Sequence, residues 1–200
     1  KIRGHICSKK GIKAAIKAKV DVIDHADRMD EECIDLMAEN GTFVTPSMYF
    51  PWMVVEENKR SGKVMWDELE GMSRGVENFA KMLPKANKAG VKLLIGDDFG
   101  ISIMPHGDYA KELEAYVKGA GIDPLDVIRW ATVNGADLLG MKDDLGSIEA
   151  GKLADLLVVD GNPAKDITVL QDRNNLDVIM KGGDMFVCQL SPSKVELKAA

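Results

Sequence analysis

Strand-like and helical segments alternate along most of the chain, and this alternation restricts the possible folds more than any other feature. Four short segments are strand candidates, namely 1–7, 20–23, 42–46 and 91–95. The last three are mainly apolar or β-branched, as strands are. Segments with helical spacing of apolar residues follow them, at 11–18, 30–40, 76–89, 109–118 and 124–139. Such an order predicts an α/β fold with a parallel sheet.

The pattern changes after residue 140. Strand-like segments now follow one another, at 153–159 and 178–187, and the second contains a Gly182-Gly183 turn. We therefore expect one unit at 1–140 and a small β module at 141–200. Four strand–helix units would make half of an eight-stranded barrel, and they suit an open doubly wound sheet equally well.

One long stretch, 48–74, interrupts the alternation. It carries aromatic residues among charged ones, namely Tyr49, Phe50, Trp52 and Trp66. Insertions that follow the C-terminal end of a strand commonly shape a pocket. These aromatic side chains either line a substrate pocket or, as is more usual, pack into a small core of the insertion itself.

Composition removes several classes of partner. The chain has 32 acidic and 26 basic residues, a net charge of -6, and no cluster of basic residues interleaved with aromatics, so we expect no nucleic-acid partner. No apolar run reaches the roughly 20 residues that span a bilayer, so we expect no membrane partner. Three cysteines make no disulfide framework, which is compatible with a cytoplasmic location. Because the chain starts with Lys1, inside a strand-like segment, we expect a truncated start.

Three residues that can bind a metal stand at or near the ends of strand-like segments. His5 lies near the end of the first segment, and His25 and Asp98 follow the second and the fourth. Because parallel α/β folds place their chemistry at the C-terminal ends of the strands, we expect the three to converge. A single histidine at such a position is more often structural, but imidazole and carboxylate together suit zinc. His106 lies on the loop that follows and is a candidate substrate contact.

Longer motifs resemble the amidohydrolase superfamily, specifically its imidazolonepropionase-like and Xaa-Pro-dipeptidase-like branch. The resemblance rests on the spacing of His5 and His25, on Gly96-Asp97-Asp98-Phe99-Gly100, and on the passages 128–140 and 146–159. It implies the C-terminal half, strands five to eight, of a (β/α)8 barrel, followed by part of a small β-sandwich. It covers nearly the whole chain.

The resemblance also implies a function. Family members are hydrolases that hold one or two divalent ions, usually zinc, and His5, His25 and Asp98 match three of the ligand positions. Asp98 would also act as the catalytic base towards a small-molecule or dipeptide substrate. Asp97, where relatives carry Thr, is expected to be a solvated neighbour. Cys7 is expected to be a packed thiol rather than a soft ligand.

The implied site is incomplete in this chain, which contains no His-x-His motif and only three histidines. Three hypotheses follow. The chain is the C-terminal part of a metal-dependent amidohydrolase that cleaves a C–N bond, a non-catalytic half-barrel, or an open-sheet α/β enzyme without a metal. Half a barrel exposes strand edges, so we expect it to pair with a missing N-terminal half or to form a homo-oligomer.

Overall fold

A four-stranded parallel sheet forms the N-terminal part of the fold. The computed structural model describes residues 1–62, 69–96 and 98–190. The strands are β1 (Arg3–Ile6), β2 (Val22–His25), β3 (Phe43–Thr45) and β4 (Lys92–Leu93), in the order β1-β2-β3-β4. All three neighbouring pairs are parallel, as predicted. The C-terminal ends of the strands therefore lie along one edge of the sheet.

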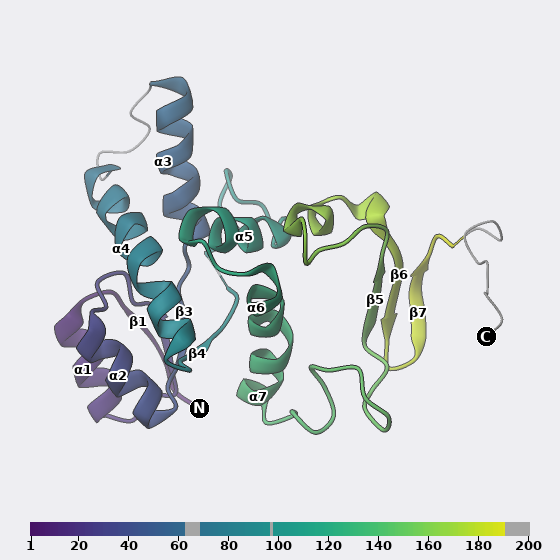
Figure 1. Cartoon of the computed structure of the whole chain (residues 1–200), viewed down its shortest axis with the longest axis horizontal. Coiled ribbons are helices and arrows are strands. Elements are labelled where there is room, and N and C mark those ends of the chain that lie inside the picture. The colour runs from purple at the N-terminus through teal and green to yellow at the C-terminus, as the bar shows by residue number, and fades with distance from the viewer. Residues whose placement is uncertain (63–68, 97, 191–200) are drawn as a thin grey trace.

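Helices cover one face of this sheet. They are α1 (Lys9–Lys17), α2 (Glu31–Asn40) and α4 (Leu69–Lys88), which Figure 1 shows beside the strands. One residue from each strand or its end packs against them in the main core: Ile6, Ile23, Val44 and Leu93. Local signals set the bounds of α2, because the Asp30 side chain accepts a hydrogen bond from the Cys33 amide and Gly41 ends the helix in the left-handed conformation.

The opposite face of the sheet carries both apolar and polar residues. Val22, Phe43 and Leu94 form a small apolar cluster there, with Leu138 packed against it. Next to this cluster Lys92 places its ammonium group 4.8 Å from the centre of the Phe43 ring. In a closed barrel this face would point inwards.

Residues 49–61 form a helix that the sequence analysis did not predict. This helix, α3 (Tyr49–Ser61), packs against α4. Pro51 lies in its first turn, where the absent N–H has no partner to lose, so the proline does not prevent the helix. Helix α4 also begins earlier than the expected 76 and continues through Pro84. Trp66 lies outside the described residues.

Two longer helical stretches follow the sheet. The first is α5 (Ala110–Glu114), which continues as the π-helical turn η1 (Ala115–Gly119). The second is α6 (Pro124–Arg129), continued by η2 (Trp130–Asn134) and α7 (Gly135–Leu139). It starts at Pro124, as predicted, and Asp123 is its N-cap, whose side chain accepts a hydrogen bond of 2.8 Å from the Leu125 amide.

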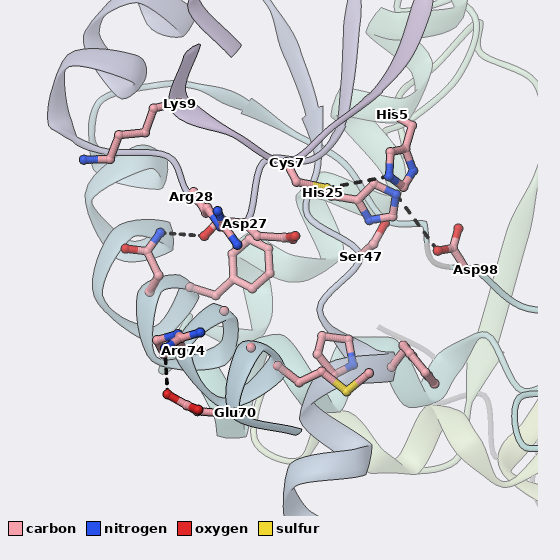
Figure 2. Close-up of a pocket in the computed structure, with 17 residues that line it drawn as sticks. His5, Cys7, Lys9, His25, Asp27, Arg28, Ser47, Glu70, Arg74 and Asp98 are labelled. Carbon is pink, nitrogen blue, oxygen red and sulfur yellow. Dashed lines mark hydrogen bonds and ion pairs between the residues drawn. The ribbon is translucent and has the colours of Figure 1, made fainter. Parts of the chain in front are cut away.

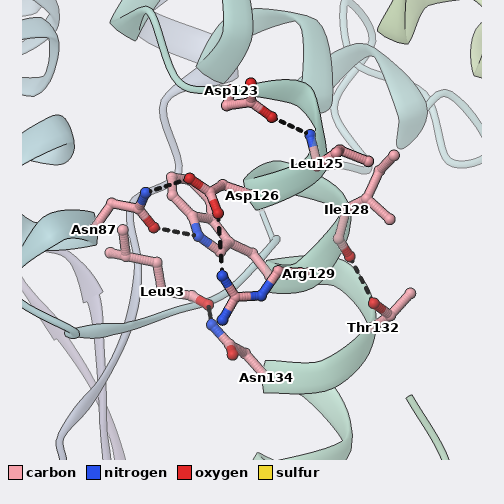
Figure 3. A network of polar contacts seen from close by, with 10 residues as sticks. Asn87, Leu93, Asp123, Leu125, Asp126, Ile128, Arg129, Thr132 and Asn134 are labelled. Atoms are coloured by element: carbon pink, nitrogen blue, oxygen red, sulfur yellow. Dashed lines mark hydrogen bonds and ion pairs between the residues drawn. The ribbon is translucent and has the colours of Figure 1, made fainter. Parts of the chain in front are cut away.

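Side-chain amides attach the second helical stretch to the rest of the fold (Figure 3). The Nδ2 atom of Asn87, on α4, donates to Asp126 Oδ2 over 2.7 Å. The Nδ2 atom of Asn134 donates to the backbone carbonyl of Leu93 in β4, also over 2.7 Å. The helix is thus fixed to the strand that precedes Asp98.

The predicted β module is a separate antiparallel sheet, drawn at the right of Figure 1. Its strands are β5 (Leu156–Val159), β6 (Leu176–Lys181) and β7 (Asp184–Cys188), in the order β5-β6-β7. The turn between β6 and β7 uses Gly182 and Gly183, both with positive φ, as predicted. Two 3-10 turns, η3 (Ile167–Gln171) and η4 (Arg173–Asn175), precede β6.

The predicted α/β class is confirmed, whereas a barrel is not. The described residues form an open four-stranded parallel sheet, and closure into a (β/α)8 barrel requires eight strands. The division into 1–140 and 141–200 stays a prediction. Within the described part of the chain, no helix is long and apolar enough to cross a membrane.

Candidate functional site

His5, His25 and Asp98 come together at the C-terminal edge of the parallel sheet (Figure 2). The rings of His5 and His25 meet edge to face, with their centroids 4.2 Å apart. The Nε2 atom of His25 lies 4.0 Å from Asp98 Oδ2. All three side chains line one open cavity of about 1080 Å³. The expected convergence is therefore observed, while the roles assigned to these residues stay predictions.

The backbone is unusual at this edge. His25, Ala26 and Ser47 have φ values of 73°, 57° and 51°, in the left-handed region that non-glycine residues rarely adopt. His25 ends β2, and Ser47 lies two residues beyond the end of β3. Strained conformations of this kind cluster at functional sites, where the surrounding structure holds them in place. Here His25 and Ala26 lie where one candidate ligand leaves the sheet, and Ser47 lines the same cavity.

Asp98 differs from the histidines in its surroundings. It lies five residues after the end of β4, and 71% of its side chain is exposed, against 12% for His25. Asp98 therefore lines the cavity and is also exposed to solvent. Asp97, its neighbour in the sequence, lies outside the described residues.

Cys7 also lines the cavity, with its Sγ atom 3.7 Å from His5 Nε2. Burial raises the pKa of the Cys7 thiol to about 11, and the carboxylate of Asp27 contributes in the same direction. That Cys7 is a packed thiol rather than a soft ligand stays a prediction.

The walls of the cavity come from the insertion that interrupts the strand–helix alternation and from the helix that follows it. Phe50 and Pro51 of α3 and Met72 and Phe79 of α4 supply apolar surface. Polar residues lie among them: Lys9, Asp27, Arg28, Glu70, Arg74 and Asn78. An apolar wall with a few polar groups is typical of a small-molecule site. No sequence pattern marked Asp27, Arg28 or Arg74 as residues of a cavity.

His106 is placed differently from the other two histidines. Its Nδ1 atom lies 3.1 Å from the Tyr109 hydroxyl, its ring lies beside Gly100, and it is not among the residues that line this cavity. The aromatic residues of α3 differ in their surroundings, and Tyr49 packs against residues outside the insertion. Phe50 lines the cavity, whereas Tyr49 is buried and stacks on Phe99 at a centroid distance of 5.8 Å.

The donor types suit a divalent metal, although their arrangement is not a finished metal site. Among the residues that the structure describes, no group of three or more His, Cys, Asp or Glu side chains stands in a metal-holding arrangement. Tetrahedral zinc with ligands at about 2.0–2.2 Å would place two of them roughly 3.4 Å apart. The 4.0 Å between His25 Nε2 and Asp98 Oδ2 is somewhat longer than this.

Residues 1–186 match the Amidohydrolase family, and the chain therefore belongs to that family. Ochratoxinase of Aspergillus niger is 31% identical over 187 residues, which are 92% of this chain and 38% of the enzyme. Imidazolonepropionase of Shouchella clausii is 29% identical over 209 residues, covering 81% of this chain and 45% of the enzyme. The family predicted from the motifs is confirmed.

Solved structures agree with this assignment. A Xaa-Pro dipeptidase with bound methionine in its active site matches 92% of this chain with a TM-score of 0.75 and 38% identity. A putative prolidase from Bifidobacterium longum matches with a TM-score of 0.78 and 27% identity. The chain covers 44% and 46% of these two structures. It thus spans less than half the length of the relatives that it matches.

Proposed function

We propose that this chain is the C-terminal portion of a metal-dependent amidohydrolase that hydrolyses a C–N bond in an amide, a dipeptide or a cyclic amide. The observation that carries the proposal is the placement of His5, His25 and Asp98 around one cavity, with 4.0 Å between His25 Nε2 and Asp98 Oδ2. Members of the family are hydrolases acting on C–N bonds.

His5, His25 and Asp98 would hold the metal. Zinc is the expected ion, because imidazole and carboxylate groups are among its usual ligands. When bound, zinc would act as a Lewis acid and would lower the pKa of the water bound to it to about 7. The Asp98 carboxylate accepts a proton from the attacking water at one oxygen and returns it to the nitrogen of the leaving amine. The exposure of Asp98 to the cavity leaves room for both transfers.

The chain offers part of a site, and the remaining ligands would come from elsewhere in the complete protein. An upstream half with a His-x-His motif is the proposed source. A homo-oligomer is an alternative only for covering the exposed strand edges, because a second copy brings no His-x-His. The apolar wall of Phe50, Met72 and Phe79 suits a small substrate with an apolar group. His106 is retained as a proposed substrate contact, because loops after barrel strands determine specificity.

The test compares wild-type and Asp98→Asn forms of the complete, zinc-loaded protein on a panel of amides and dipeptides. We expect kcat to fall by roughly three to four orders of magnitude, because a metal ligand and a proton acceptor are lost together. Asp108→Asn is a matched control, since Asp108 pairs with Lys111 over 2.6 Å and does not line the cavity. Near wild-type turnover of Asp98→Asn would reject the role of Asp98.

A further inference from the structure

Gly96, two residues before Asp98, is held from three directions. Its amide donates to Glu112 Oε1 over 3.0 Å, and its carbonyl accepts from the Ser47 hydroxyl over 3.2 Å. Its α-carbon faces Thr45 so closely that a Cβ at this position would lie 2.8 Å from Thr45 Cγ2. The three contacts come from α5 and from the end of β3 and the residues just after it. These contacts restrict the backbone conformation of Gly96.

Glu112 is an unusual residue to find in this place. It lies on α5 and is only 1% exposed, although a buried carboxylate is costly unless it is hydrogen-bonded. Its Oε1 atom accepts from the Gly96 amide and also from the Tyr116 hydroxyl, at 2.5 Å. Strand β4 ends at Leu93, so the Gly96 amide lies beyond the ladder with β3 and receives its acceptor from the Glu112 side chain.

The support extends behind Glu112. The Tyr116 ring meets the Trp130 ring edge to face at 5.4 Å. The indole nitrogen of Trp130 in turn donates to Asn87 Oδ1 over 3.0 Å. All of these side chains come from helices, so Glu112 is itself held by rigid elements. Such a further layer of contacts can keep a reacting group in place, where small displacements lower the rate strongly.

We propose that Glu112 is a positioning residue: by holding Gly96 it fixes the loop that presents Asp98 to His25. This inference rests on the proposed function, because it assigns Glu112 a role through Asp98. It predicts two separable effects. The first effect is on the order of the loop, and it can be measured without an activity assay. The second is on turnover, and it is expected only if Asp98 is the catalytic base.

The first experiment measures hydrogen exchange at the Gly96 amide in the complete protein. In Glu112→Leu we expect exchange at least about tenfold faster than in wild type, because the acceptor is gone, while the Ile23 amide in β2 is unchanged. Glu112→Asp, shorter by one methylene, should show an intermediate rate and serves if the Leu variant folds poorly. Glu114→Leu is the matched control, because Glu114 lies on the same helix but pairs with Lys118 and Gln171.

The second experiment is a double-mutant cycle on the zinc-loaded enzyme. We expect Glu112→Leu to lower kcat about 10- to 100-fold with KM changed less than about threefold, and Glu112→Gln, whose amide oxygen can accept the same bonds, to keep most of the activity. In the Asp98→Asn background Glu112→Leu should have no further effect.

The two failures are distinguishable. Unchanged Gly96 exchange in both Glu112→Leu and Glu112→Asp would overturn the hold on the loop, whatever the activity. If Glu112→Leu lowered kcat by the same factor in the Asp98→Asn background as in wild type, the link to Asp98 would be overturned. Failure of the proposed function itself would appear as normal turnover of Asp98→Asn alone, before Glu112 is changed.

Discussion

The ring of His5 meets the ring of His25 edge to face, although strand geometry alone would separate them. His5 is the register partner of Asp24, and His25 is the partner of Ile6. Because successive side chains alternate between the two faces of a sheet, regular strands would direct the two histidines to opposite faces. The backbone of His25 instead has a φ of 73°, which turns its side chain out of the alternation. The contact therefore depends on a strained strand end.

The placement of His25 beside His5 predicts that a His25 variant binds zinc more weakly than a His106 variant. We expect His25→Asn to weaken zinc binding by the complete protein at least about 100-fold, because an imidazole that binds the metal directly is lost. Asparagine tolerates a left-handed backbone, so the strand end should keep its shape. Competition with a chromophoric chelator measures the affinity. His106→Asn is the control and should bind zinc as wild type does; equal affinities for both variants would contradict the assignment of His25.

The close approach of Gly96 to Thr45 predicts a loss of stability in Gly96→Ala. The new Cβ would lie 2.8 Å from Thr45 Cγ2, and Thr45 is buried, so we expect a cost of about 1–3 kcal/mol in the free energy of unfolding. Denaturant titration measures it. Thr45→Ser removes the methyl group and should recover part of the loss in the double variant.

Gly75→Ala is the matched control for this experiment. Gly75 lies inside α4, and a Cβ there would have nothing within 4 Å. We expect no loss, or a gain of about 0.5–1 kcal/mol from the higher helix propensity of alanine. A similar cost for both glycines would show that contact with Thr45 is not the cause.

Much of the fold could be predicted from the sequence because the signals were local. Strand-like segments marked the four parallel strands, the predicted helices 30–40 and 124–139 began where α2 and α6 begin to within a residue, and Gly182-Gly183 marked the last turn. Helix α3 could not be predicted in this way. Its first residues, Tyr49-Phe50-Pro51-Trp52, have no amphipathic spacing, and besides α4 it packs against η1, which is distant in sequence.

The candidate site was predictable only in part, for a related reason. His5, His25 and Asp98 follow strand-like segments, so topology alone brings them to one edge. Glu112 lies in the run Ala110-Lys111-Glu112-Leu113-Glu114, where it looks like any acid on a solvated helix. Only the tertiary structure shows that Glu112 is buried and bonded to the loop before Asp98.

The N-cap of α2 predicts a pH-dependent contribution to stability. Hydrogen bonds from Cys33, then contact with Lys9, hold the pKa of the Asp30 carboxyl well below its usual value. A depressed pKa means that the stabilisation is fully present above the unfolded-state pKa of about 3.9 and is lost as the pH falls towards the folded-state value. We expect Asp30→Ala to cost about 1 kcal/mol at pH 7.

Denaturant titration at a series of pH values checks this prediction. The difference between wild type and Asp30→Ala should be constant from about pH 5 to pH 8 and should shrink below about pH 4. Asp30→Asn keeps a good N-cap and should lose less stability at pH 7 than Asp30→Ala. A difference that grows on acidification would contradict a depressed pKa of the Asp30 carboxyl.

The environment of Cys7 predicts slow reaction with alkylating agents. With the thiol pKa raised to about 11, chiefly by burial, little thiolate exists near neutral pH. We expect iodoacetamide to modify Cys7 at least about tenfold more slowly than the exposed Cys188, as measured by mass spectrometry of the peptides. Asp27→Asn removes the second cause of the raised pKa and should accelerate modification of Cys7 only moderately, because burial remains. Acceleration to the rate of Cys188 would show instead that the Asp27 carboxylate dominates.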